Sequence, residues 1–221
     1  MVEIGPGKGA LTSHLLERAD HVVAIEIDPI LVQYLRAKFR GNDRLEVIAA
    51  DILKVDVCQW GPAVIAGNLP YYIVSPIVTK VLGMGGRLAR AVFLVQKEVA
   101  DRLAASPGSR DYGYLSVATQ VSAEVELLFA VPPAAFHPMP KVDSAVVRLT
   151  PRAQPQGVDP TKFLHFVSLA FQHKRKTLRN NLAGEYDRAV LDTLPEGKLR
   201  AEQMSIEALV GLYGRLQGVV S

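Results

Sequence analysis

The sequence predicts an α/β protein with a mostly parallel sheet, an antiparallel sheet edge and a small all-α domain at the carboxyl end. Three observations predict it. Short β-branched segments alternate with helical segments over the first 105 residues, as in parallel strands joined by right-handed crossovers. Two strand-like segments without a helix between them follow. Beyond residue 157 only helical spacing remains.

The elements of the first part of the chain follow from apolar periodicity and from the positions of proline and glycine. Strands are expected at residues 2–4, 21–25, 45–49, 63–66 and 91–95, and helices at 10–18, 29–39, 73–82 and 97–105. Pro29 near the start of the second helix, with Asp28 just before it, predicts a capped helix N-terminus.

The change of pattern near residue 120 indicates the domain organisation. A proline-rich loop joins segments 124–131 and 144–149, so we expect them to pair antiparallel at a sheet edge. The polar Pro/Gly stretch 151–160 is the expected linker, with helices at 161–172 and 206–216 beyond it. The sequence therefore predicts one domain at residues 1–152 and a helical domain at 157–221.

Composition excludes several classes of protein. No apolar run reaches the roughly 18 residues that a membrane span needs. The start, Met-Val-Glu-Ile, has neither the basic region nor the cleavage site of a signal peptide. The single cysteine, Cys58, excludes an internal disulfide framework and a cysteine-rich metal site. We therefore expect a cytoplasmic protein without a bound metal.

A glycine-rich turn, VEIGPGKGALT, connects the first strand to the first helix. Gly5, Gly7 and Gly9 would let the backbone approach a ligand closely. Glu26 ends the next strand, 21 positions after Gly5, where a carboxylate can accept hydrogen bonds from two ribose hydroxyls. Because Gly5-x-Gly7-x-x-Ala10 also satisfies the dinucleotide fingerprint, these residues leave an NAD-type enzyme open as an alternative.

Asp51 follows the third strand in the segment IAADIL. Ligands of open α/β sheets lie at the carboxyl ends of the strands, so the Asp51 carboxylate can accept a hydrogen bond from the exocyclic amine of an adenine. The alternative is an N-cap for the short turn that follows. We expect the ligand contact.

The fourth strand ends in the loop AGNLPYYIVSP. The amide oxygen of Asn68 and a neighbouring backbone carbonyl can accept both hydrogens of an aryl amine, which lets the nitrogen lone pair face a methyl donor. An adjacent tyrosine ring can stack on the base. The alternative is a turn in which Asn68 bonds its own backbone and the tyrosines pack outward. We favour a site that holds a flat, amine-bearing base.

Seven segments resemble, in the same order, those of the KsgA/RsmA family of small-subunit (16S) ribosomal RNA adenine N6,N6-dimethyltransferases. They lie between residue 2 and about residue 184 and read EIGPGKGALT, VVAIEID, AADIL, GNLPYY, VFLVQKEVADRL, PPAAFHPMPKVDSAVVRL and LAFQHKRKTLRNNL. The resemblance implies a Rossmann-like catalytic domain followed by a helical RNA-binding domain. It also implies that S-adenosyl-L-methionine, rather than NAD, serves to dimethylate two adjacent adenosines near the rRNA 3′ end.

The resemblance further implies roles for single residues. The cofactor would be bound by Gly5, Gly7, Gly9, Glu26, Ile27, Asp51, Ile52 and Asn68. Glu26 would hold the ribose, and Asp51 and the Ile52 backbone would meet the adenine. The catalytic set would be Asn68, Leu69, Pro70, Tyr71 and Phe136. Asn68 would be its key residue, assisted by a carbonyl of Leu69 or Pro70, while Tyr71 and Phe136 stack on the flipped adenine.

The segment QHKRKTLRNNL concentrates positive charge, with Lys174, Arg175, Lys176 and Arg179 and no acidic residue. Residues 151–221 hold 10 Lys+Arg against 7 Asp+Glu, which accounts for the whole net charge of +3. Such density suits contacts to phosphates, and the alternative is a solvated helix face. With the resemblance, we expect these four side chains to bind ribosomal RNA.

Relatives usually carry a few dozen residues before the first strand, including a Gln-Asn-Phe-Leu type segment over the methionine end of the cofactor. Met1 stands directly at the start of the expected first strand, so we expect weak cofactor binding by this chain. Two other functions stay open: a large-subunit rRNA adenine methyltransferase, and a non-catalytic RNA-binding or ribosome-assembly factor. A monomer that acts on the small ribosomal subunit is the expected state.

Overall fold

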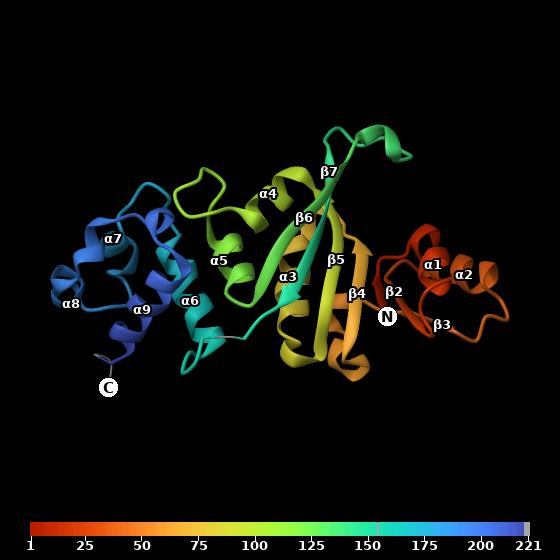
Figure 1. Cartoon of the computed structure of the whole chain (residues 1–221), viewed down its shortest axis with the longest axis horizontal. Coiled ribbons are helices and arrows are strands. Elements are labelled where there is room, and N and C mark those ends of the chain that lie inside the picture. Colours follow the sequence, from red (N-terminus) through yellow and green to blue (C-terminus); the bar gives the residue numbers. More distant parts are fainter. Residues whose placement is uncertain (154, 219–221) are drawn as a thin grey trace. The chain divides into compact units, whose positions relative to one another are not determined.

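The computed structural model describes residues 1–153 and 155–218, and of Tyr71 the backbone only. Within these residues the strands form a seven-stranded sheet in the order β3-β2-β1-β4-β5-β7-β6 (Figure 1). The strands are β1 (Val2–Ile4), β2 (Val22–Glu26), β3 (Leu45–Ala49), β4 (Ala63–Asn68), β5 (Leu88–Gln96), β6 (Ala123–Val131) and β7 (Ser144–Pro151). The predicted fold class is confirmed.

The parallel part of the sheet has a topological switch point. The chain runs outward from β1 through β2 to β3, then returns to pair β4 with the other side of β1. The register places Ile4 opposite both Ile25 and Gly67. The carboxyl ends of β1, β2 and β4 therefore meet at one edge, which is where open α/β sheets bind ligands.

The helices of this part lie where the periodicity predicts them. They are α1 (Ala10–Leu16), α2 (Pro29–Lys38), α3 (Val74–Leu82) and α4 (Lys97–Ala104). Asp28 caps α2 by accepting a hydrogen bond from the Ile30 N–H at 2.8 Å, as predicted. α1 packs on β2, α2 on β2 and β3, and α3 on β5, which buries the apolar faces of the strands that lead to the edge.

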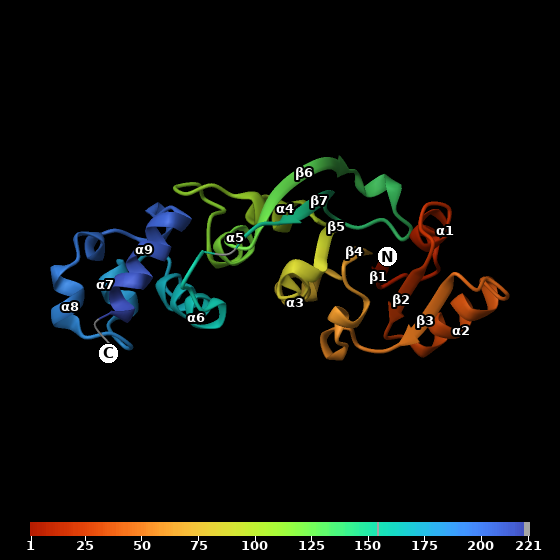
Figure 2. The same cartoon turned by 60° about the horizontal axis from the view of Figure 1, so that its bottom comes forward.

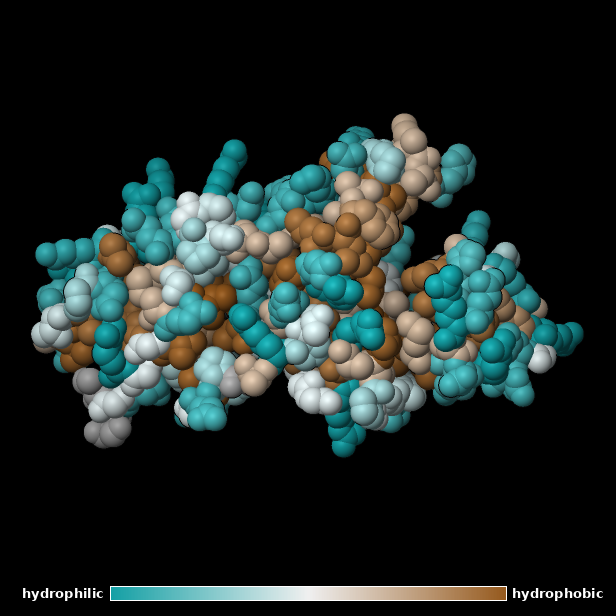
Figure 3. All heavy atoms as spheres, in the orientation of Figure 1, coloured by the Kyte–Doolittle hydropathy of each residue, from teal (hydrophilic) through white to brown (hydrophobic). Residues whose placement is uncertain are grey.

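The antiparallel edge is also confirmed. β7 pairs with β5, and β6 pairs with β7 with a register shift between Leu127 and Phe129. Figure 3 shows apolar side chains gathered over this strand pair. The side chains of Leu127, Leu128 and Phe129 are 45%, 36% and 61% exposed. The loop from β6 to β7 extends beyond the strands in both ribbon views (Figure 2), at the end where the parallel strands terminate.

The chain divides into two compact units. The first holds residues 1–100 and 123–151, and the second holds residues 101–122 and 152–221. The expected division between residues 152 and 157 thus omits one segment, because residues 101–122 go with the helical unit. The reason is burial: Tyr112, Val117 and Val121 belong to the same hydrophobic core as Phe163 and Phe166. The helix α5 (Tyr114–Gln120) of this segment was not predicted from the sequence.

The helical unit contains α6 (Pro160–Ala170), α7 (Leu178–Leu182), α8 (Arg188–Thr193) and α9 (Ile206–Gln217). The expected helices at 161–172 and 206–216 are present as α6 and α9. The two short helices between them span fewer than two turns each, too short for a periodic signal. Among the described residues, no helix is both long enough and apolar enough to cross a membrane.

Candidate active site

The glycine turn after β1 has a backbone that only glycine adopts readily. Gly5, Gly7 and Gly9 have φ values of 65°, 59° and 75°, in the left-handed region where a Cβ is strained. The Gly9 N–H closes the turn by donating to the Pro6 carbonyl at 2.9 Å. The turn leads directly into α1.

The three glycines serve different purposes. Gly5 lines the large cavity at the sheet edge. Gly7 has open space where a Cβ would stand. A Cβ on Gly9 would lie 2.7 Å from Cε2 of Phe39 and 2.9 Å from Cδ2 of Leu35, so Gly9 makes room for these two side chains beside the start of α1. Gly7 and Gly9 are not among the described residues that line the cavity.

Glu26 ends β2 with its side chain buried, 6% exposed. Its Oε1 accepts hydrogen bonds from the Ile27 and Asp28 N–H groups at 2.9 and 3.0 Å, and its Oε2 accepts one from the Gly7 N–H at 3.1 Å. A carboxylate offers about four acceptor positions, so three backbone donors orient Glu26 and leave capacity for a ligand hydroxyl.

Asp51 follows β3 and caps a helical turn, the role that the sequence offered as the alternative to ligand contact. Its Oδ1 accepts a hydrogen bond from the Leu53 N–H at 2.9 Å and caps a short 3₁₀ turn, Ile52–Lys54. Asp51 also lines the cavity. The cap occupies one carboxylate oxygen and fixes the side chain, so capping and ligand contact are compatible.

Asn68 is the last residue of β4, and its side chain is exposed. The next residue, Leu69, is 1% exposed and anchors the loop through its N–H, which donates to the Leu94 carbonyl at 3.0 Å. The Pro70 carbonyl accepts a hydrogen bond from the Ile73 N–H at 3.1 Å. The Tyr71 side chain, predicted to stack on the target base, lies outside the described part of the chain.

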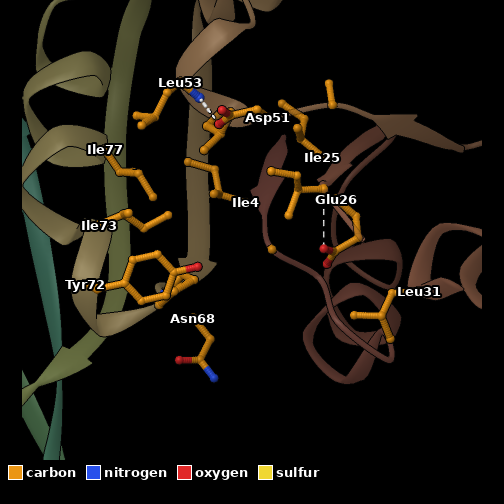
Figure 4. Close-up of a pocket in the computed structure, with 15 residues that line it drawn as sticks. Ile4, Ile25, Glu26, Leu31, Asp51, Leu53, Asn68, Tyr72, Ile73 and Ile77 are labelled. Atoms are coloured by element: carbon orange, nitrogen blue, oxygen red, sulfur yellow. Dashed lines mark hydrogen bonds between the residues drawn. The ribbon is translucent and has the colours of Figure 1, made fainter. Parts of the chain in front are cut away.

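These residues surround a cavity of about 450 Å³ at the switch point. Figure 4 shows Asn68 and Tyr72 on one side of it, Glu26 on the other and Asp51 at a third position. The apolar part of the wall includes Ile4, Ile25, Leu31, Leu53, Ile73 and Ile77. The volume falls in the range of small-molecule sites, and a mostly apolar wall with a few polar groups is typical of them.

The structure brings together most, but not all, of the residues that the sequence suggested. The cavity is lined by Gly5, Glu26, Ile27, Asp51, Ile52, Asn68 and Pro70 of the predicted set. Leu69 is buried behind the loop. Phe136 is half-buried in the loop between β6 and β7 and does not line this cavity.

Tyr72 is the residue that sequence reasoning missed. Its side chain is 85% exposed yet lines the cavity beside Asn68 (Figure 4). The available signal was the pair of adjacent tyrosines. The short 3₁₀ turn, Tyr71–Ile73, turns successive side chains in different directions, and sequence alone does not indicate which of the two faces the cavity.

A second carboxylate lies beneath the glycine turn. Glu3, in the middle of β1, is 1% exposed, and its Oε2 accepts a hydrogen bond from Oγ1 of Thr12 at 2.6 Å. Burial raises the pKa of the Glu3 carboxyl, the Thr12 hydrogen bond opposes this, and the Glu26 charge adds to the rise. The Glu3–Thr12 pair links β1 to α1 and so supports the turn between them.

The first part of the basic segment is a turn between α6 and α7, and the side chains of Lys174, Arg175 and Lys176 in it are exposed. Arg179 lies in α7. Nη1 of Arg179 lies 2.8 Å from Oδ1 of Asp192, so an acidic residue distant in sequence pairs with it. The buried amide of Asn181 donates to the Ala170 carbonyl at 2.7 Å and to the His173 carbonyl at 3.2 Å.

Two solved methyltransferase structures share this fold and cover nearly the whole chain, which places the chain in the methyltransferase class. Over 98% of its length the chain is similar to a dimethyladenosine transferase from Plasmodium falciparum, with a TM-score of 0.83, 25% identity and 89% of that chain covered. It is also similar to the 23S rRNA methyltransferase ErmE, with a TM-score of 0.71, 33% identity and 90% covered. Residues 1–214 match the family described as ribosomal RNA adenine dimethylase, and the chain belongs to that family.

Curated relatives agree. A protein named ribosomal RNA small subunit methyltransferase A from Acidobacterium capsulatum is 44% identical over 98% of this chain and 81% of its own length. Proteins of the same name from Legionella pneumophila and Desulfitobacterium hafniense are 46% and 49% identical, over 96% and 83% of this chain and 84% and 67% of their own lengths. Family membership removes the NAD-dependent alternative.

Proposed function

We propose that this enzyme uses S-adenosyl-L-methionine to dimethylate the N6 amine of two adjacent adenosines near the 3′ end of small-subunit ribosomal RNA. The observation that carries the proposal is the cavity at the switch point, which places Glu26, Asp51 and Asn68 around one space. The small-subunit target rests on the names of the relatives at 44–49% identity. A monomer that works in the cytoplasm fits this role.

The cavity fits the proposed cofactor. The ordered Glu26 carboxylate would accept hydrogen bonds from ribose hydroxyls, and the second oxygen of Asp51 would accept one from the adenine amine. Ile27, Ile52 and the absence of a side chain on Gly5 would leave a flat apolar slot for the ring. When bound, the cofactor supplies an electrophilic methyl group.

The residues of the Asn68 loop would orient the target amine. The side-chain oxygen of Asn68 accepts one N–H, and a backbone carbonyl accepts the other. The Leu69 carbonyl suits this second role, because the Pro70 carbonyl already accepts from Ile73. With both N–H bonds directed at acceptors, the nitrogen lone pair points at the methyl group, and the amine loses its proton to solvent after transfer.

Aromatic rings would hold the base after it leaves the RNA stack. Tyr71 and Phe136 remain the proposed stacking residues. Tyr72 joins them because it stands beside Asn68 and is 85% exposed, and an exposed ring at the mouth of a cavity has a free face for a base.

The basic turn after α6 would bind the RNA backbone. Lys174, Arg175 and Lys176 would contact rRNA phosphates, because their side chains are exposed and close together in the chain. Arg179 would contribute less because of its pairing with Asp192.

The test uses the protein, S-adenosyl-L-methionine and small subunits that lack the modification, followed by RNA digestion and mass spectrometry for dimethyladenosine. The expected result is product with the unchanged protein and a loss of at least about a hundredfold with Asn68→Ala, since a positioned transition-state acceptor contributes about 10²–10³. Asn42→Ala, which removes an amide near α2, is the matched control. The proposal is wrong if the unchanged protein binds cofactor by calorimetry but forms no product.

Large-subunit RNA is the second candidate target, favoured by the 33% identity to ErmE. The same assay with protein-free large-subunit RNA distinguishes the two. A non-catalytic assembly factor is the third candidate. It predicts that Asn68→Ala keeps both ribosome affinity and biological effect, whereas the enzyme should keep affinity and lose the effect.

A further inference from the structure

A second, polar cavity lies at the same sheet edge as Asn68. It has a volume of about 320 Å³ and is lined by residues of the β5 end, the α4 start and the β6–β7 loop, among them Gln96, Lys97, Glu98, Lys141 and Asp143. None of these residues belongs to the cofactor cavity. Its volume is at the small end of the range for ligand sites, so it suits a single nucleoside rather than an RNA duplex.

The strand register fixes how near the two sites are. Asn68 on β4 is opposite Leu94 on β5, and Gln96 is two residues further toward the carboxyl end. With a lateral strand spacing of about 4.8 Å and a rise of about 3.3 Å per residue, the Asn68 and Gln96 Cα atoms are roughly 8 Å apart. A nucleotide joined to the target adenosine would therefore reach the second cavity.

The cavity wall also includes the loop that carries Phe136. Pro133 lines the cavity, and its carbonyl accepts a hydrogen bond from the Phe136 N–H at 3.1 Å. The opposite side is held by the Lys97 N–H, which donates to the Asp143 carbonyl at 2.9 Å. The loop proposed to contact the target base therefore also forms part of the wall of the second cavity, and a backbone hydrogen bond joins it to the start of α4.

The charges of the cavity favour a nucleoside over a phosphate. Lys97 and Lys141 are matched by Glu98 and Asp143, so the wall has no net positive charge to attract an anion. Ammonium and amide groups can donate to ring nitrogens and to a ribose oxygen, and carboxylates can accept from an exocyclic amine. This mixture of donors and acceptors matches the edge of a base with its sugar.

We propose that this cavity binds the nucleoside adjacent to the target adenosine, so that one of the two neighbouring adenosines is held while the other is methylated. The inference rests on the proposed function and adds that residues of the second cavity recognise the RNA nucleotide next to the target adenosine. It assigns Lys141 and Asp143 to substrate positioning, because their side chains reach the cavity without entering the hydrophobic core.

The test is a cycle of protein and RNA changes. Small subunits are assembled from unmethylated rRNA, either of native sequence (called native subunits below) or with one of the two adenosines replaced by uridine, and kcat/KM for methylation of the remaining adenosine is measured. We expect each replacement to slow the unchanged protein about tenfold and Lys141→Ala or Asp143→Asn to slow methylation of native subunits about tenfold. A protein variant combined with an RNA replacement should lower kcat/KM little more than either change alone, because both remove the same interaction.

The matched control is Arg44→Ala, which removes one exposed positive charge next to the amino end of β3, at the opposite edge of the sheet. It should leave all rates unchanged. If the variants and the RNA replacements multiply their effects, or if the variants alter cofactor affinity in calorimetry, the inference is wrong. If the unchanged protein does not methylate native subunits, the proposed function fails instead, so the two failures are distinguishable.

Discussion

The backbone N–H of Gly7 donates a 3.1 Å hydrogen bond to Oε2 of Glu26. The glycine turn and the carboxylate at the end of β2 are therefore one ordered unit, although 19 positions separate them in the sequence. The consequence is that the carboxylate proposed to hold the ribose is already oriented before any ligand binds. A site with its acceptors in place loses less conformational freedom when it binds.

Glu26→Gln should weaken both folding and cofactor binding. An amide has one acceptor oxygen, so its NH₂ group would face at least one of the three N–H donors that now bind the carboxylate. Leaving a buried donor without an acceptor costs about 1–3 kcal/mol. Urea unfolding and calorimetry with S-adenosyl-L-methionine measure the two effects. Glu17→Gln, on the exposed end of α1, is the control, and equal behaviour of the two variants would contradict the prediction.

Gly9→Ala should destabilise the protein by about 2–4 kcal/mol. The residue combines a left-handed backbone, with φ of 75°, and a Cβ position 2.7 Å from Cε2 of Phe39. Gly41→Ala is the matched control, because Gly41 has φ of 81° and no neighbouring atom within 4 Å. It should lose only the backbone part, about 1–2 kcal/mol. If the two variants lose the same free energy of unfolding in urea, the close contact of the new Cβ with Phe39 does not destabilise the protein.

Glu3→Gln should change how stability depends on pH. Burial raises the Glu3 pKa above its ordinary value of 4.5 in the folded state, so the folded protein favours the neutral carboxyl. The contribution of Glu3 to stability is complete below pH 4.5 and is lost as the pH rises through the raised folded-state pKa. Glutamine stays neutral and still accepts from Thr12.

The stability of Glu3→Gln relative to the unchanged protein should therefore rise from acidic to neutral pH and then level off. Thermal unfolding at a series of pH values measures this difference. A constant difference at all pH values would show that the pKa of Glu3 is the same in the folded and unfolded states, against the rise expected from burial.

Tyr112→Phe should destabilise the helical unit by about 1–2 kcal/mol. The buried Tyr112 hydroxyl donates to the Met204 carbonyl at 3.0 Å, and this bond links residues 101–122 to the carboxyl-terminal segment. Burial raises the pKa of Tyr112 to about 12, so the hydroxyl remains a donor at neutral pH. Tyr114→Phe, which changes a 37% exposed ring, should be nearly neutral in urea unfolding. If Tyr112→Phe leaves the free energy of unfolding unchanged, the hydrogen bond to Met204 does not stabilise the protein.

Charge removal in the turn after α6 should lower both RNA affinity and its salt dependence. For every phosphate that a side chain no longer neutralises, the slope of log K against log salt falls by about 0.7–0.9. Arg175→Ala and Lys176→Ala should each show this change in filter binding to small subunits. Arg179→Ala should show less of it, because its guanidinium is paired with Asp192 at 2.8 Å. Arg40→Ala, at the end of α2, is the control, and a larger effect at Arg179 than at Arg175 would contradict the assignment.

Much of the fold follows from local sequence. The alternation of strands and helices, the cap at Asp28, the antiparallel pairing of β6 with β7 and the turn at Gly5 to Gly9 all depend on residues close together in the chain. The residues proposed to bind the cofactor also follow from it. They lie at the end of a predicted parallel strand or in the loop that follows it, and topology brings those strand ends together.

Other features depend on contacts between distant residues. Packing decided that residues 101–122 join the helical unit, because their apolar side chains fill a core made mainly by residues beyond 157. Packing also explains Gly9, whose missing side chain makes room for Phe39. Tyr72 faces the cavity because of the 3₁₀ turn, and Arg179 is neutralised by a residue 13 positions away.

The sequence by itself therefore determined the class of fold and indicated the edge of the sheet that carries the candidate site, together with the roles proposed for Glu26, Asp51 and Asn68. Only the tertiary structure decided which predicted residues face the cavity, which are structural, and where the second cavity lies. The physical reason is the range of the interactions. Periodicity and turn chemistry act over a few residues, whereas burial and charge pairing depend on what the folded chain brings together.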